Sequence, residues 1–271
     1  MRHLGGLVLV LLVMGAGPGW GWSPAMQESI SETGARLAPP DLLRQIAKHR
    51  GKLREGTRAA FYDGDESRHY FNGELPGRLG ARDVESLKAR GQLDRVVLYE
   101  VDGAIKAIQA LRPFEEVVYR LGVVAHYVAD LNHPLNCSAE DAMEPRYFGD
   151  FSRYAESAAP RFQPVFYGLR PALQQAETPQ QLIDEARERC RKTYPRIGDE
   201  YRRIGTIDGR RHFDDRSTAF GVTALAYSHA ISDVAEIYRY IWLHSGGRDG
   251  RKQLPLRGQT AVAVPKDPAT D

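Results

Sequence analysis

The 271-residue sequence lacks most of the short motifs by which a function is recognised directly. It contains no Walker loop, no glycine-rich nucleotide fingerprint, no paired-cysteine zinc motif and no internal repeat. Its formal net charge is only +2, which argues against a dedicated nucleic-acid-binding domain but leaves a local basic patch open. The hydrophobic content of 42% excludes a disordered or fibrous chain and can supply the core of one domain or of two small ones.

Long apolar runs are also missing, so no segment predicts a transmembrane helix. A short run from Leu4 to Ala16 follows Arg2 and precedes small residues, which is the layout of a secretory signal peptide. We therefore expect residues 1–19 to be removed on export and the mature protein to be secreted or periplasmic. Cleavage falls directly before Trp20 or directly before Trp22, and an uncleaved anchor is the weaker alternative.

Cysteine is scarce, because Cys137 and Cys190 are the only two in the chain. In an exported protein, two cysteines suggest a disulfide. The spacing does not show whether the two residues meet, so a pair of buried free thiols is the alternative.

Strand signals are weak as well, since no segment alternates convincingly between apolar and polar residues. Helical periodicity dominates, which predicts a mainly α protein. The expected helices cover residues 22–37, 41–54, 81–111, 150–159, 162–175, 178–204 and 216–243. A further helix follows Pro113, and residues 56–81 form a long loop in which Gly56 ends the preceding helix. Residues 245–271 predict a disordered tail, which leaves 20–244 as a single domain.

The stretch LGVVAHYVADLNHPLN, residues 121–136, places His126 and Asp130 four residues apart on one helix face. A neutral imidazole and a carboxylate are suitable zinc ligands. A buried histidine bonded to a nearby aspartate is the structural alternative. The loop before this helix offers further ligands in His69 with Asp63 or Asp65, which are otherwise turn formers and a surface histidine.

His229 and Asp233 repeat the same four-residue spacing in the last long helix. The apolar residues around them are typical of a core helix, so we interpret this pair as a satisfied polar contact of the interior. The adjacent Ser228 does not indicate a catalytic triad, because a nucleophile and its base need to be close in space rather than in sequence.

Three segments occur in an order that points to a known family. They are WGW at 20–22, HYF at 69–71 and AHYVADLNHPLN at 125–136. Together they resemble the zinc-dependent phospholipase C and S1/P1 nuclease superfamily over roughly residues 20–160. The resemblance implies an all-α, single helical-bundle domain and an exported enzyme that hydrolyses phosphodiesters with three zinc ions.

The resemblance also implies specific ligands. The amino nitrogen and carbonyl oxygen of Trp20 would bind zinc, as would His69, His126 and Asp130, and Asp130 would bridge two ions. Clustered zinc lowers the pKa of bound water and neutralises the phosphate, so no protein nucleophile is needed. His126 and Asp130 would then be the central catalytic residues.

The sequence departs from the family pattern at several positions. Ala25 stands where nuclease-like members have a histidine, and Asn136 replaces another, although His133 lies three residues earlier. A downstream histidine and glutamate correspond to Phe151 and Ala155. We therefore expect a reduced centre with one or two zinc ions. Its candidate ligands are Trp20, Asp63, Asp65, His69, His126, Asp130 and His133.

Two functions follow from these residues. The first is an exported zinc-dependent phosphodiester hydrolase of the phospholipase C type, which acts on phospholipid or alternatively on nucleic acid. The second is a non-catalytic phospholipase C-like protein that binds a lipid, a protein partner or a structural metal. Metal content and activity separate the two.

Overall fold

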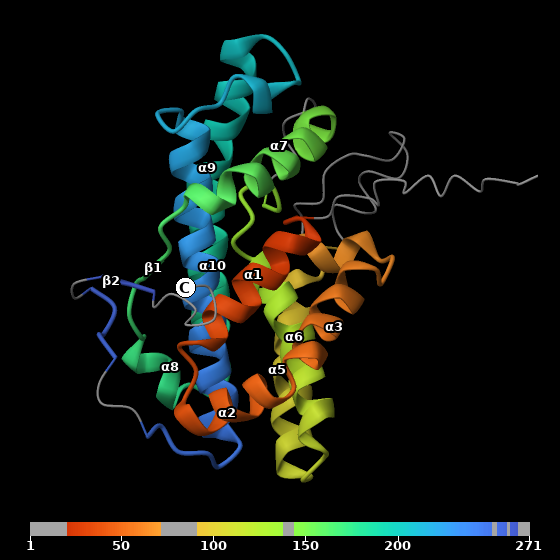
Figure 1. Cartoon of the computed structure of the whole chain (residues 1–271), viewed down its shortest axis with the longest axis vertical. Helices are drawn as coiled ribbons and strands as arrows, with labels where there is room; N and C mark the ends of the chain where they lie inside the picture. Colours follow the sequence, from red (N-terminus) through yellow and green to blue (C-terminus); the bar gives the residue numbers. More distant parts are fainter. Residues whose placement is uncertain (1–20, 72–90, 138–143, 251–253, 259–260, 265–271) are drawn as a thin grey trace, which may run out of the picture.

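The computed structural model describes residues 21–71, 91–137, 144–250, 254–258 and 261–264. The expected signal peptide and Trp20 lie outside these ranges. The described chain is a helical bundle with one small antiparallel sheet (Figure 1), which confirms the predicted all-α class. Its elements are α1 (Pro24–Ala35), α2 (Pro40–Lys48), α3 (Arg50–Phe61), η1 (Glu66–His69), α5 (Leu93–Gln109), α6 (Phe114–Asp130), α7 (Glu144–Ala158), η2 (Ala159–Arg161), β1 (Val165–Phe166), α8 (Pro171–Gln175), α9 (Gln180–Ile204), η3 (Gly209–Arg211), α10 (Thr218–His244) and β2 (Val262–Ala263).

Helix α6 lies inside the bundle and packs against α1, α3, α5 and α10 (Figure 1). It begins after Pro113 with Glu115 and Glu116 in its first turn, where carboxylates interact favourably with the helix dipole. Every residue from Val124 to Asp130 is buried. The polar end of α6 is therefore enclosed by protein, and its side chains must find partners within the bundle. Among the described residues, no helix combines the length and apolar character that a membrane span needs.

Helices α3 and α6 approach closely because a glycine on each faces the backbone of the other. A Cβ atom at Gly56 would lie 1.9 Å from a backbone oxygen of α6, and one at Gly122 would lie 2.1 Å from a backbone oxygen of α3. The predicted helix end at Gly56 is wrong, since this glycine lies inside α3. The contact brings the carbonyl group of Thr57 next to His126.

Two further predictions of secondary structure are wrong. Residues 162–175 do not form one helix but contain β1 and the short α8, with a left-handed turn at Gly168 (φ +89°). Part of the tail expected to be disordered, within 245–271, forms β2 and pairs with β1, placing Val165 opposite Ala263. Local periodicity does not reveal this sheet because its strands are two residues long and distant in sequence.

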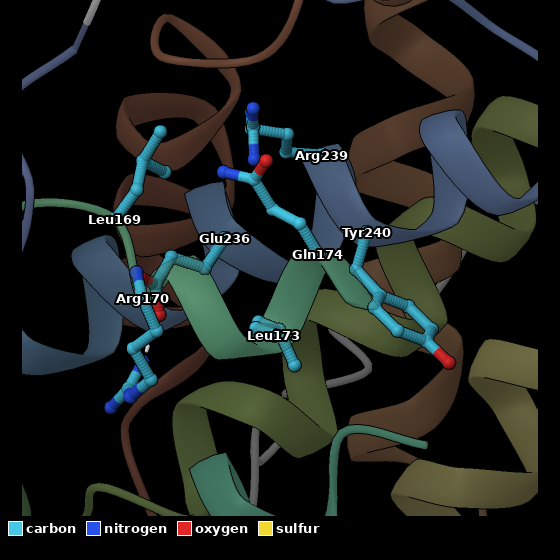
Figure 2. Close-up of a pocket in the computed structure, with 7 residues that line it drawn as sticks. All are labelled: Leu169, Arg170, Leu173, Gln174, Glu236, Arg239 and Tyr240. Atoms are coloured by element: carbon cyan, nitrogen blue, oxygen red, sulfur yellow. Dashed lines mark hydrogen bonds and ion pairs between the residues drawn. The ribbon is translucent and has the colours of Figure 1, made fainter. Parts of the chain in front are cut away.

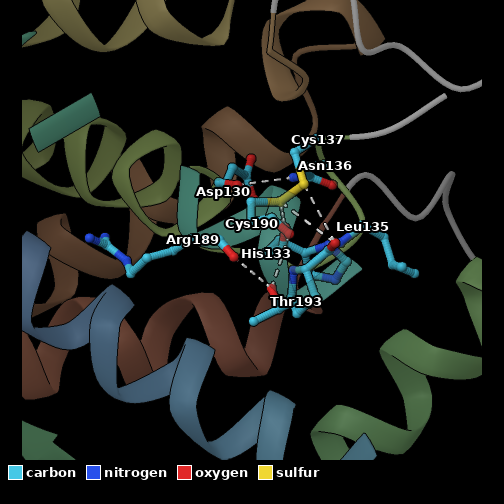
Figure 3. Close-up of a disulfide and its surroundings, with 9 residues drawn as sticks. Asp130, His133, Leu135, Asn136, Cys137, Arg189, Cys190 and Thr193 are labelled. Carbon is cyan, nitrogen blue, oxygen red and sulfur yellow. Dashed lines mark hydrogen bonds between the residues drawn. A yellow bond between two sulfur atoms is a disulfide. The ribbon is translucent and has the colours of Figure 1, made fainter. Parts of the chain in front are cut away.

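A disulfide joins the loop after α6 to α9. Cys137 and Cys190 are bonded with an S–S distance of 2.03 Å, which confirms the expected bridge (Figure 3). The two residues are 53 positions apart, so the bond restricts the unfolded chain and stabilises the folded one. It also fixes the loop that follows Asp130 against a long helix.

A cluster of buried charges lies where α9 and the segment between β1 and α8 pack on α10. The Asp233 carboxylate is fully buried and accepts hydrogen bonds from Arg170 at 3.2 Å, from Arg257 at 3.3 Å and from Arg189. Glu236, on the next turn of α10, pairs with Arg170 (Figure 2). Each buried charge thus has a partner of opposite sign.

His229 does not make the bond to Asp233 that the sequence predicted. Its ring instead stacks on that of Tyr167, with the ring centroids 4.2 Å apart. Asp233 is occupied by guanidinium groups that come from distant parts of the chain. The interpretation of an interior helix is correct, and the expected partner is wrong because arginines outcompete a neutral imidazole for a buried carboxylate.

The free energy of unfolding is expected to fall as the pH is lowered from about 6.5 to about 4. Burial, reinforced by the charges of Arg189, Arg257 and Arg170 and opposed by Asp233, lowers the pKa of His229 from 6.5 to about 4. As the pH falls, the unfolded chain takes up this proton before the folded chain does. The stability contributed by neutral His229 is therefore complete above pH 6.5 and is lost as the pH falls to about 4. Urea unfolding at several pH values in this range measures how steeply the free energy of unfolding depends on pH. This dependence should be shallower in His229→Gln. An equal slope in both proteins would contradict the assignment.

Candidate metal centre

Three buried side chains from two elements meet at the C-terminal end of α6. His126 and Asp130 lie one turn apart on α6, and His69 is the last residue of η1. All three are 0% exposed. Their imidazole nitrogens and carboxylate oxygen lie within 4.8 Å of one another. Among the described residues, this is the one group of histidine, cysteine or acidic side chains with donor atoms close enough to hold a metal ion.

The three side chains are in direct contact. His69 Nδ1 lies 2.7 Å from Asp130 Oδ2, and His126 Nε2 lies 3.2 Å from the same oxygen. The two imidazole nitrogens are 3.3 Å apart. Hydrogen bonds therefore hold the group together in the absence of an ion, and a bound metal would take the place of a shared proton.

The backbone of α3 fixes the protonation pattern of His126. The Nδ1–H group of His126 donates to the carbonyl oxygen of Thr57 at 3.1 Å, because a carbonyl can only accept. In the neutral imidazole, Nε2 then keeps its lone pair and can ligate a metal ion. A hydrogen bond from the second ring nitrogen to a backbone carbonyl is the usual support of a histidine that ligates a metal. Thr57 could not be identified from the sequence, since a backbone acceptor leaves no side-chain signal.

Asp63 contacts the opposite edge of the His69 ring. Its Oδ1 lies 3.5 Å from His69 Nε2, and its other oxygen accepts from the Tyr127 hydroxyl and pairs with Arg68 at 3.0 Å. Asp63 therefore lies behind His69 as seen from Asp130. This position orients the imidazole rather than adding a ligand to the group of three.

The pKa of His69 and the pKa values of the two carboxylates beside it are shifted in opposite directions. Burial disfavours the charged form of His69, but hydrogen bonds to Asp130 and Asp63 outweigh it and raise its pKa from 6.5 to about 9. Burial raises the pKa of Asp63, but its hydrogen bonds to His69 and Tyr127 outweigh this effect and lower the pKa to about 2. For Asp130, the charge of His126 and the bonds to both histidines likewise hold the pKa below its usual value despite complete burial. The carboxylates are therefore ionised and available to a cation at neutral pH.

Asp65 is not part of the group. Its carboxylate accepts from the backbone nitrogen of Ser67 at 3.1 Å and from the Ser67 hydroxyl at 2.7 Å, which caps η1. The sequence left Asp63 and Asp65 as equal candidates because both lie in an irregular loop. The structure separates them, since Asp65 is a turn former of the kind weighed as the alternative.

The second oxygen of Asp130 is held by Gln27, a residue that sequence analysis did not select. Gln27 Nε2 donates to Asp130 Oδ1 at 2.7 Å, and the side chain is 1% exposed. Its Oε1 is buried without a hydrogen-bond partner among the described residues. Gln27 follows Trp22 by five positions, the same interval that separates Ala25 from Trp20.

Gly21 packs directly on the Asp130 carboxylate. Its φ is +104°, and a Cβ atom at this position would lie 2.4 Å from Asp130 Oδ1. Ser152 of α7 donates to the carbonyl oxygen of Gly21 at 3.1 Å, and the Trp22 indole donates to the carbonyl oxygen of Ala129 at 3.0 Å. The start of the described chain is therefore held against the end of α6, and a side chain in place of Gly21 would collide with the site.

His133 lies away from the group and is surrounded by aromatic rings. The ring centroids of Trp22, Phe148 and Phe151 lie 4.9, 5.1 and 5.8 Å from that of His133. Its Nδ1 accepts from the backbone nitrogen of Leu135 at 3.3 Å. The structure therefore does not bring His133 to the His69, His126 and Asp130 group.

The other positions at which the sequence departs from the family pattern contribute no acidic or imidazole ligand. Asn136 donates through Nδ2 to the carbonyl oxygen of Asp130 at 3.3 Å (Figure 3), and its Oδ1 has no hydrogen-bond partner among the described residues. Phe151 packs in the aromatic cluster around His133, and Ala25 is exposed.

The residues present fit a single metal ion. Two imidazoles and one carboxylate are a donor set that divalent transition metals accept. The buried Oε1 of Gln27 and Oδ1 of Asn136 are oxygen atoms beside Asp130 that lack a hydrogen donor among the described residues. Unsatisfied buried acceptors are costly, and a cation or a metal-bound water nearby would satisfy them.

Neither a protein-family model nor a curated protein matches the sequence. Solved structures do match the fold. Alpha toxin from Clostridium absonum aligns with a TM-score of 0.58 at 15% identity, over 82% of this chain and 66% of the toxin. Clostridium perfringens alpha-toxin from avian strain SWCP aligns with a TM-score of 0.55 at 13% identity, over 86% of this chain and 68% of the toxin. This chain spans about two thirds of the toxins' length, and the likeness shows that it shares their all-α fold over that part.

Proposed function

We propose that this chain is an exported zinc-dependent phosphodiester hydrolase of the phospholipase C type, with a metal centre reduced to one ion or at most two. The observation that carries the proposal is the buried group of His69, His126 and Asp130 at the end of α6. A fold alone does not imply an activity, so the donor set is what gives the alpha-toxin-like fold its functional meaning. The sequence resemblance supports phospholipid as the substrate and nucleic acid as the second substrate class.

His69, His126 and Asp130 would hold the zinc ion. Three protein ligands of this type are typical of catalytic zinc sites, in which the remaining position belongs to water or substrate. Zinc would lower the pKa of a bound water and neutralise the charge of a phosphodiester. No side-chain nucleophile is then required.

The surrounding residues have positioning roles in this proposal. Thr57 holds the Nδ1 proton of His126 and so keeps Nε2 free to ligate. The Asp63 carboxylate lies 3.5 Å from the far edge of the His69 ring, and Gln27 orients the Asp130 carboxylate. Partners of this kind fix ring orientation and commonly change metal affinity by about 10- to 100-fold when removed.

The structure also supports one of the two cleavage sites considered. Gly21 and Trp22 lie against the end of α6, and Gly21 touches the Asp130 carboxylate. Cleavage between them would place the new amino group of Trp22 beside Asp130. An α-amino group at that position could supply the nitrogen ligand that the family resemblance assigns to an N-terminal tryptophan.

A second candidate function is a non-catalytic relative that binds a lipid, a protein partner or a structural metal. The observation in its favour is the burial of the ligands, since His69, His126 and Asp130 are each 0% exposed. Structural zinc sites are closed, whereas catalytic sites keep a position open to substrate.

Protein purified from the periplasm without chelator is expected to contain about one zinc ion per chain. It should hydrolyse phosphatidylcholine vesicles or single-stranded nucleic acid, and His126→Ala should lose both the metal and the turnover. His212→Ala, at an exposed histidine, is the control and should retain both. Absence of zinc would contradict both the site and the activity. Zinc without turnover on either substrate would favour the non-catalytic candidate.

A further inference from the structure

The short loop that follows α6, residues 131–137, contacts both the end of that helix and the segment that carries His69. Its residue Asn136 is 0% exposed, and the Nδ2 group donates to the carbonyl oxygen of Asp130 at 3.3 Å (Figure 3). The carbonyl oxygen of Asn136 accepts from the backbone nitrogen of Phe71 at 3.3 Å. Phe71 lies two residues after His69, so Asn136 joins the segment of His69 to the end of α6.

This connection matters most when a metal ion is bound. Without an ion, His69 and Asp130 hold each other directly, because His69 Nδ1 lies 2.7 Å from Asp130 Oδ2. An ion bound between the same two atoms takes the place of that hydrogen bond. The surrounding backbone contacts must then keep the two ligands in register. A small displacement of either ligand costs affinity, because zinc bonds to nitrogen and oxygen are only about 2 Å long.

The Cys137–Cys190 disulfide anchors this loop to α9 (Figure 3). Cys137 directly follows Asn136 in the chain, and both cysteines are buried. Helix α9 packs on α10, so the disulfide fastens the loop to the body of the bundle. Reduction would remove this covalent anchor, and Asn136 would then keep its place through hydrogen bonds and packing alone.

We propose that the Cys137–Cys190 disulfide completes the metal centre. With the bond closed, Asn136 holds the segment of His69 at the end of α6, and the three ligands bind zinc tightly. With the bond open, this tie loosens and the affinity for zinc falls by about 10- to 100-fold, which is the usual effect of losing a partner that orients a ligand. This role rests on the proposed function, because it concerns the same metal site.

Thiol–disulfide exchange forms the bond. The thiols of Cys137 and Cys190 transfer two electrons and two protons to a disulfide-containing donor, which becomes a dithiol, and one sulfur–sulfur bond forms in the chain. Disulfides form and persist in the periplasm and outside the cell, whereas cytosolic thiols stay reduced. The proposed export would therefore bring the chain to the compartment in which its centre becomes complete. Before export, the hydrolase would retain little zinc and show little activity.

The affinity for zinc of the oxidised protein, compared with that of Cys137→Ala/Cys190→Ala, tests this role. Competition with a coloured chelator measures both. The double variant has no thiol, so zinc captured by cysteine cannot mask the effect, and it should bind zinc about 10- to 100-fold more weakly. Equal affinity would overturn the role of the disulfide and leave the proposed function standing. If the oxidised protein binds no zinc, both are overturned.

Two further variants separate positioning from overall stability. Val117→Ala removes buried volume at the opposite end of α6 from Asp130, so it should lower the free energy of unfolding but bind zinc like the parent. A loss of zinc affinity in Val117→Ala equal to that of the double cysteine variant would show that zinc binding follows stability, which would overturn the positioning role.

Asn136→Ala, with the disulfide intact, should also weaken zinc binding, since it removes the hydrogen bond to the carbonyl oxygen of Asp130. Combined with Cys137→Ala/Cys190→Ala, it should add little to the loss, because both changes act on one tie. Unchanged zinc affinity in Asn136→Ala would overturn the proposed connection even if the double cysteine variant does not fold. Fully additive losses would overturn it as well.

Discussion

Replacement of Asp130 by asparagine is expected to lower the affinity for zinc by more than about a hundredfold. The carboxylate contacts both histidines of the group, at 2.7 Å for His69 and 3.2 Å for His126, and it is completely buried. Asparagine has nearly the same shape, but it removes the negative charge that offsets the positive charge of the ion. The substitution thus tests the charge of the site with little change in packing.

Competition with a coloured chelator measures this affinity, and circular dichroism confirms that the variant is folded. Asp199→Asn provides the matched control, because Asp199 is 70% exposed and pairs only with Arg202 on the surface of α9 among the described residues. Asp63→Asn should give an intermediate loss of about 10- to 100-fold, as expected for a residue that orients a ligand. Unchanged affinity in Asp130→Asn would remove Asp130 from the site, and with it the proposed hydrolase.

Asp233→Asn is expected to lower the free energy of unfolding by about 3–5 kcal/mol. Asp233 is 0% exposed and accepts from Arg170, Arg189 and Arg257. When Asp233 loses its charge, only Glu236 and the partly exposed Glu185 remain to balance the positive charges of these arginines. The cost arises mainly from these unpaired charges, since an intact buried ion pair contributes little by itself.

Urea unfolding at neutral pH, followed by circular dichroism, measures this loss. Asp184→Asn on the exposed face of α9 is the control and should unfold like the parent protein. A midpoint for Asp233→Asn within error of the parent would show that the arginines find other partners or water when Asp233 is neutral.

Local periodicity was sufficient for the part of the site that lies on one helix. His126 and Asp130 had to face the same way once α6 was helical, because residues four apart share a face. His69 lies in an irregular segment, so its position beside Asp130 followed from the family resemblance and not from spacing. Distances between separate elements depend on packing that a single sequence does not display.

The contacts that could not be predicted from the sequence all join residues that are far apart in the chain. Gln27 reaches Asp130 across 103 positions, and the Thr57 carbonyl reaches His126 across 69. Arg257, in the segment predicted to be a disordered tail, bonds to the buried Asp233. Nothing in the local composition of these segments encodes such contacts, which form only when distant parts of the chain are brought together.

The close approach of α3 and α6, which Gly56 and Gly122 each permit, determines whether this centre could be moved to another protein. Each glycine allows the other helix's backbone to approach to a distance that a single methyl group would prevent. The acceptor for His126 comes from α3, so α6 with its ligands is incomplete by itself. A protein engineer who wished to transplant the centre into another scaffold would have to graft α3 and α6, with both glycines retained, together with His69 of η1.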